Sequence, residues 1–235
     1  MEEIRSSTVL PALRKAIELK TLDGETLIGE LAVPAVGSPK TTLIMLHPLP
    51  THGGFMDSHL IRKASNRLPA LIGAAVLRFN TRGTSSPQGT STGHFEEGIG
   101  EAADVAAAVQ FCREQGLPTP WLVGWSFGTE LAIKYGPDHA IEGAILLSPP
   151  LHRATEVDLM RWNEFGKPLI ALVPELDEFL EPVAAKARFS VATHAEVIGY
   201  DQEKHLWVGE NATRKVLDKI AEVVAPGNSP LPTSY

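Results

Sequence analysis

The chain has 235 residues, and its 21 lysines and arginines stand against 28 aspartates and glutamates, for a formal net charge of −7. A chain of this length can bury one sizeable core, so we expect a single domain over residues 1–225. No cluster of basic side chains is present to neutralise phosphates, which argues against a nucleic-acid partner. The single cysteine, Cys112, excludes an internal disulfide framework and favours a cytoplasmic location.

The N-terminal residues 1–15 open with acidic side chains and lack the apolar segment that is typical of a signal peptide. No uninterrupted apolar run is long enough to span a bilayer. We therefore expect neither a signal peptide nor a membrane anchor. Nothing in the sequence sets an oligomeric state.

The first predicted elements are two strands, 16–20 and 26–33, joined at Asp23-Gly24, a pair typical of a tight hairpin. Six further segments are apolar almost throughout, as expected of strands covered on both faces: 41–47, 74–80, 121–126, 143–148, 168–173 and 195–200. Helical spacing lies between them, over 57–73, 100–116, 127–136, 182–190 and 211–224.

This order of elements predicts an α/β fold. A hairpin followed by repeated strand and helix units implies a mostly parallel sheet of about eight strands with helices on both faces, because parallel neighbours need crossover connections. Residues 226–235 show no apolar period, and we expect them to form a flexible tail. Ligands of such sheets gather outside the carboxyl ends of the strands, so the candidate site residues are those that follow a strand.

Ser126 follows the strand 121–125 inside the pattern GWSFG, between Gly124 and Gly128. A strand, a sharp turn and a helix surround it, which is the context of a serine nucleophile on an α/β sheet. Small residues are needed there because strand and helix pack closely around the turn. The alternative is a glycine-rich loop with a serine that caps the helix. Agreement between motif and context favours the nucleophile.

A serine hydroxyl needs a base, and four histidines follow Ser126 in the chain. His139 precedes a strand, His152 leaves no room for an acid between it and the serine, and His194 lies at the amino end of its strand. His205 follows the strand 195–200 on the correct side of the sheet, so it is the predicted base. An ordinary surface-loop histidine is the alternative.

The acid that orients the histidine should follow the preceding strand, where the sequence reads PELDEFLEP. Asp177 is the first choice and Glu175 the reserve. An aspartate at this place can also simply cap the next helix, and position along the chain does not separate the two roles.

Acyl transfer also needs donors for the developing oxyanion. The main-chain N–H of Phe127, directly after the serine, is one predicted donor. In the loop after the strand 41–47, Pro48 and Pro50 have no N–H, so Leu49 supplies the second.

No cofactor is implied by the sequence. His47, His52 and Asp57 are candidate metal ligands, but the intervening prolines prevent a helical placement of the two histidines, so we predict no metal site. Cys112 lies within an amphipathic helix and is expected to be a small buried apolar residue.

The sequence resembles the small serine-type α/β-hydrolases that carry an HPxPxxGG loop. The resemblance covers residues 25–220 through LHPLPTHGGFMDS, LRFNTRGTSSPQG, GIGEAADVAAAV and GWSFGT, and more weakly through PELDEFLEP and EKHLWVGE. It implies the α/β-hydrolase fold, with Ser126 as nucleophile, Asp177 as acid and His205 as base. The acid loop departs from the family pattern, because Pro174-Glu175 replaces its usual glycine.

Only residues 151–167 separate two of the predicted strands, too few for a large lid, so we expect an open pocket for a small acyl substrate. The function expected from the sequence is hydrolysis of a small ester, thioester or amide. Two alternatives stand beside it: a catalytically silent binding protein that keeps the fold, and a small prolyl-type peptidase.

Overall fold

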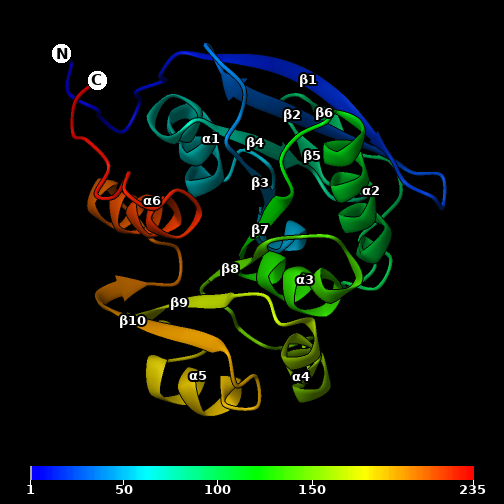
Figure 1. Cartoon of the computed structure of the whole chain (residues 1–235). Coiled ribbons are helices and arrows are strands. Elements are labelled where there is room, and N and C mark those ends of the chain that lie inside the picture. Colours follow the sequence, from blue (N-terminus) through cyan, green and yellow to red (C-terminus); the bar gives the residue numbers. More distant parts are fainter. Residues whose placement is uncertain (1) are drawn as a thin grey trace.

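The computed structural model describes residues 2–235 and centres on one twisted sheet of eight strands (Figure 1). The strands follow the order β1-β2-β4-β3-β7-β8-β9-β10. Their bounds are Ala12–Lys20 (β1), Thr26–Pro34 (β2), Thr41–Leu46 (β3), Ala74–Phe79 (β4), Pro120–Trp125 (β7), Gly143–Leu147 (β8), Leu169–Leu176 (β9) and Ala195–Lys204 (β10). A separate small hairpin consists of β5 (Ser85–Ser86) and β6 (Gly89–Thr90).

The sheet is antiparallel only at its first strands. β1 pairs with β2 and β2 with β4 in antiparallel register, whereas every other neighbouring pair is parallel. Gly24 has a φ of 100° in the turn between β1 and β2, a conformation that glycine adopts without strain. The predicted hairpin and the mostly parallel sheet are therefore confirmed.

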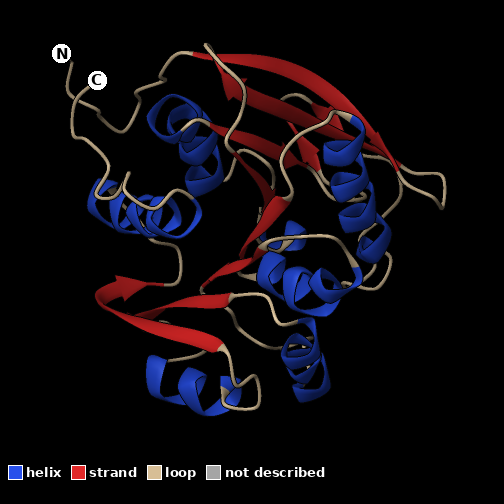
Figure 2. Ribbon diagram, in the orientation of Figure 1, coloured by secondary structure: helices blue, strands red, loops and turns tan. Residues whose placement is uncertain are grey.

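Helices cover both faces of the sheet (Figure 2). α1 and α6 lie on one face, and α2, α3, α4 and α5 lie on the other, each set over its own cluster of buried apolar side chains. The helix bounds are His59–Ile72 (α1), Glu101–Glu114 (α2), Phe127–Tyr135 (α3), Glu156–Phe165 (α4), Pro182–Phe189 (α5) and Glu210–Val224 (α6), with 3₁₀ turns at Pro50–His52 (η1) and Gly136–Asp138 (η2). Within residues 2–235, none of these helices combines the length and apolarity needed to cross a membrane.

Helix α4 is absent from the sequence-based prediction. It buries only Leu159 and Trp162, so its apolar period is too sparse to stand out from a loop. Its start is nevertheless encoded, because Thr155 and Asp158 exchange side-chain and main-chain hydrogen bonds as a capping box.

The C-terminal segment, which we expect from the sequence to be a flexible tail, contacts the rest of the domain in the structure. Leu231 is buried against the cluster under α1 and α6, and its N–H donates to Asp218 of α6 at 2.8 Å. The main chains of Glu2 and Tyr235 exchange two hydrogen bonds of 2.9 Å, so the two termini lie side by side (Figure 1). One apolar anchor and a main-chain pairing are enough to hold a segment that has no apolar period of its own.

Candidate active site

Ser126 lies in the sharp turn between β7 and α3. Its backbone is forced to φ 52° and ψ −116°, and its N–H donates to the carbonyl of Leu147 in the neighbouring strand at 2.9 Å. A Cβ at Gly124 would lie 2.3 Å from the carbonyl oxygen of Gly128, and one at Gly128 would lie 2.1 Å from that of Leu46. Only glycine fits at either position, which explains the two glycines around the serine.

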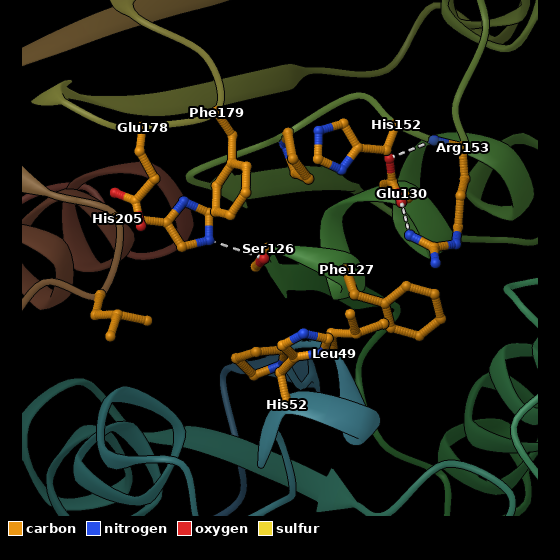
Figure 3. Close-up of a pocket in the computed structure, with 13 residues that line it drawn as sticks. Leu49, His52, Ser126, Phe127, Glu130, His152, Arg153, Glu178, Phe179 and His205 are labelled. Carbon is orange, nitrogen blue, oxygen red and sulfur yellow. Dashed lines mark hydrogen bonds and ion pairs between the residues drawn. The ribbon is translucent and has the colours of Figure 1, made fainter.

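His205 lies beside Ser126, in the loop that follows β10 (Figure 3). Its Nε2 is 2.9 Å from the Ser126 hydroxyl. Its Nδ1 is 2.9 Å and 3.0 Å from the two carboxylate oxygens of Asp177, after β9. The structure therefore brings together the hydroxyl, the imidazole and the carboxylate that the sequence predicts, from three separate strand ends.

The contacts at the end of β9 distinguish the two candidate acids, Asp177 and Glu175. Asp177 is 5% exposed, and its Oδ1 also accepts the main-chain N–H of Phe179 at 2.9 Å. Glu175 is exposed and instead accepts the N–H of Gln202 at 2.8 Å. Helix α5 has Glu181 as its N-cap residue, so Asp177 does not cap it. Of the two carboxylates, only that of Asp177 meets the imidazole.

Two residues that line the cavity of Ser126, Leu49 and Phe127, have main-chain N–H groups with no hydrogen-bond acceptor in residues 2–235. Phe127 is the first residue of α3, where N–H groups have no partner within the helix. Leu49 precedes the 3₁₀ turn η1 in the loop after β3, and both residues line the same cavity as Ser126.

The buried His47 shapes the Leu49 loop. Its Nε2 accepts the main-chain N–H of Thr81 at 3.0 Å, so the ring proton is on Nδ1, which donates to the carbonyl of Pro48 at 2.7 Å. Burial lowers the pKa of His47 from 6.5 to about 4. The ring is therefore neutral near pH 7 and keeps both bonds.

The cavity at Ser126 has a volume of about 480 Å³ and is open to solvent. One wall is aromatic: the Phe179 ring meets His205 edge-on at 4.7 Å between centroids, and His152 meets Phe179 at 5.4 Å. His152, which the sequence argues against as the base, lines the cavity, and within residues 2–235 it makes no hydrogen bond to Ser126.

A charged pair, Arg153 and Glu130, also lines the cavity. The N–H of Arg153 donates to Glu130 Oε1 at 2.6 Å, and its guanidinium lies 3.5 Å from Glu130 Oε2 and 5.5 Å from the Phe127 ring centroid (Figure 3). Glu130 is fully buried one helical turn after Ser126. The sequence analysis does not predict Glu130 or Arg153 as lining residues. For Glu130 a signal exists, because a carboxylate four residues after Ser126 lies on the same side of α3 as the serine.

The residues weighed as metal ligands have separate partners. His47 bonds to Thr81 and Pro48, Asp57 pairs with Arg78, and His52 lines the cavity. Residues 2–235 contain no group of three ligands that could hold a metal ion. Cys112 is buried in α2, where desolvation raises its thiol pKa to about 12.

Comparison with known proteins identifies the family of this chain. The model of the alpha/beta hydrolase family matches residues 43–229. A curated relative, an uncharacterized protein of Rickettsia prowazekii, is 30% identical over 120 residues, which are 49% of this chain and 48% of the relative. The chain thus matches about half the length of that relative.

Solved structures show the same fold. A lidless α/β serine hydrolase from Xanthomonas campestris superimposes with a TM-score of 0.68 at 25% identity, covering 85% of this chain and 89% of the other. An α/β serine hydrolase homologue from Coxiella burnetii gives 0.74 at 22% identity, with 90% and 97% covered. A Pyrococcus furiosus esterase gives 0.74 at 18% identity, with 92% and 96% covered. The expected α/β-hydrolase fold is confirmed, and the chain belongs to the α/β-hydrolase family.

Proposed function

We propose that this protein is a serine hydrolase that cleaves a small ester, or a thioester or amide, through an acyl-enzyme on Ser126. The observation that carries the proposal is the continuous chain of hydrogen bonds from Asp177 through His205 to Ser126, with contacts of 2.9 Å on each side of the imidazole. Such a chain gives a weak nucleophile the base that it needs.

In the acylation half-reaction, Ser126 Oγ attacks the substrate carbonyl carbon while its proton passes to His205 Nε2. The carbonyl oxygen becomes an oxyanion, and the free N–H groups of Leu49 and Phe127 are the donors that stabilise it. The C–O, C–S or C–N bond then breaks, and His205 returns the proton to the leaving group. Water repeats the sequence in the second half-reaction and releases the acid.

Asp177 holds the imidazole with its Nδ1 proton toward the carboxylate, so that Nε2 faces Ser126 as an acceptor. No metal and no cofactor take part in this mechanism. The cavity supports a small substrate, because in residues 2–235 the only helix between β8 and β9 is α4, which has 10 residues, and the cavity at Ser126 opens to solvent. The single cysteine supports a cytoplasmic location.

The test is labelling with a fluorophosphonate probe, followed by turnover of p-nitrophenyl acetate. We expect the probe to modify Ser126 and the Ser126→Ala variant to lose both labelling and nearly all turnover. Folded wild-type protein that resists the probe and turns over no faster than Ser126→Ala would overturn the proposal in favour of a silent binding protein. A panel of matched esters, thioesters and aminoacyl amides then identifies the bond type, and preferred cleavage of the amides would indicate a peptidase.

A further inference from the structure

The main-chain carbonyl of His205 accepts hydrogen bonds from two buried side chains. Trp125 Nε1 donates at 3.2 Å and Ser148 Oγ at 3.0 Å. Ser148 Oγ in turn accepts from Trp207 Nε1 at 2.8 Å. An indole N–H can only donate, so the direction of both hydrogen bonds is determined: Trp207 donates to Ser148, and Ser148 donates to the carbonyl of His205.

These bonds join three strand ends that are distant in sequence. Trp125 ends β7 directly before Ser126, Ser148 follows β8, and His205 and Trp207 follow β10. The pairing of β10 with β9 is irregular between Tyr200 and Lys204, and its last pair joins Lys204 to Leu176. His205 follows this last pair, so the side-chain bonds fix a stretch of main chain that the sheet no longer pairs.

The network also contains strained backbone. Ser126, Ser148 and Trp207 have φ values of 52°, 51° and 48°, a region that side chains other than glycine rarely adopt. Such conformations persist only where the surroundings over-determine them. Ser148 and Trp207 are 0% exposed and Trp125 is 3% exposed, so water does not compete for these bonds.

We propose that Ser148 and Trp207, with Trp125, are positioning residues for the catalytic base. They touch neither substrate nor reacting atoms; they fix the main chain of His205 so that its Nε2 stays within 2.9 Å of Ser126 Oγ. This inference rests on the proposed function, because it assigns the bonds a role in the transfer of a proton at His205. Without these hydrogen bonds the imidazole of His205 would move away from Ser126. A misplacement of about 1 Å costs on the order of 100-fold in rate.

The experiment compares Ser148→Ala and Trp207→Phe with a matched control, Trp162→Phe. Trp162, like Trp207, is a buried tryptophan whose indole N–H donates a hydrogen bond, in this case to the carbonyl of Ile133 at 3.0 Å, but it lies on α4 away from His205. We expect kcat to fall about 10- to 100-fold in the first two variants with KM within about twofold, because only transition-state geometry is lost. Trp162→Phe should keep kcat while losing a comparable amount of thermal stability.

A second readout needs no substrate. The Nδ1 proton that His205 shares with Asp177 should give a far-downfield proton resonance in the wild type and in Trp162→Phe. This resonance should weaken or disappear in Ser148→Ala and Trp207→Phe. If Ser148→Ala does not fold, Trp207→Phe alone decides. Folded variants with unchanged kcat and an unchanged resonance would overturn the inference. Failure of the proposed function shows separately, as a wild type without probe labelling or turnover, and the resonance still tests the positioning.

Discussion

His47 donates a hydrogen bond to the carbonyl of Pro48, the residue next to it in the chain, at 2.7 Å. The peptide between Pro48 and Leu49 is trans, so its N–H points away from its carbonyl. By holding the Pro48 oxygen, His47 therefore turns the Leu49 N–H to the opposite side of this peptide, and Leu49 is one of the residues that line the cavity with Ser126. A buried imidazole that touches no substrate sets the direction of a proposed oxyanion donor.

We therefore expect His47→Ala to lower kcat about 10- to 100-fold, somewhat less than complete removal of a donor, because the N–H remains but is no longer aimed. His47→Asn should recover part of this loss, since its amide N–H is attached to the same carbon as the Nδ1 of histidine. Steady-state kinetics with p-nitrophenyl acetate measure both. Equal activity of His47→Ala and the wild type would contradict the role.

Gly54 provides a second test of the same loop. A Cβ at this position would lie 2.1 Å from the Pro48 oxygen and 2.9 Å from the Leu49 oxygen, both main-chain atoms that cannot turn aside. We expect Gly54→Ala to displace the Leu49 peptide and to lower kcat/KM on the order of 100-fold.

The control for Gly54→Ala is Gly116→Ala, at a glycine with φ +64° and no atom within 4 Å of the added Cβ. It should cost about 1 to 2 kcal/mol of unfolding free energy from backbone strain alone and leave kcat unchanged. Steady-state kinetics and urea unfolding of both variants distinguish displacement of the Leu49 peptide, which lowers kcat/KM, from backbone strain, which lowers the unfolding free energy. A fully active Gly54→Ala would show that the Leu49 peptide tolerates movement.

The sequence predicts the eight strands and five of the six helices because continuous apolar runs and helical periods are local signals. It also predicts Ser126 and His205, because parallel topology makes the end of each strand a site position. Ser148 is the last residue of the strand predicted over 143–148, so the same rule applies to it. Its bond to His205 depends on a loop conformation 57 residues away, which no local pattern encodes.

The sequence favours Asp177 as the acid and keeps Glu175 in reserve, because both carboxylates lie two residues apart near the end of the same strand. In the structure they have different partners, and this supports a sharp prediction. Asp177→Asn should lower kcat about 10³- to 10⁴-fold, because an amide favours the wrong imidazole tautomer. Glu175→Gln should change kcat less than about twofold, since within residues 2–235 that carboxylate bonds only to the exposed Gln202. Equal losses in the two variants would contradict the assignment of Asp177.

Burial of His47 predicts a loss of stability in acid. Its pKa is about 4 in the folded chain and 6.5 when the chain is unfolded, so between these values only the unfolded state gains the proton. The unfolding free energy should therefore fall as the pH decreases, by about 3 kcal/mol between about pH 7.5 and pH 4. Asp104, whose pKa burial raises to about 6, acts in the opposite direction and is common to the wild type and any His47 variant.

The difference between the wild type and His47→Asn isolates this contribution. Urea unfolding at several pH values measures the unfolding free energy of both proteins. Between about pH 7.5 and pH 4 it should fall by about 3 kcal/mol less in His47→Asn than in the wild type, because asparagine does not titrate. Parallel pH profiles for the two proteins would mean that the folded chain accommodates the charged imidazole.

The backbone of Ser126 predicts a conflict between activity and stability. At φ 52° and ψ −116°, a side chain is strained by about 1 to 3 kcal/mol, whereas glycine is not. Ser126→Gly and Ser126→Ala should both be inactive, but only the glycine relieves the strain. The greater freedom of glycine in the unfolded chain offsets about 0.4 to 1 kcal/mol of this gain. The unfolding free energy of Ser126→Gly should therefore exceed that of Ser126→Ala by about 1 kcal/mol, and its urea midpoint should be higher. An alanine variant of equal or greater stability would show that the turn at the nucleophile holds no strain.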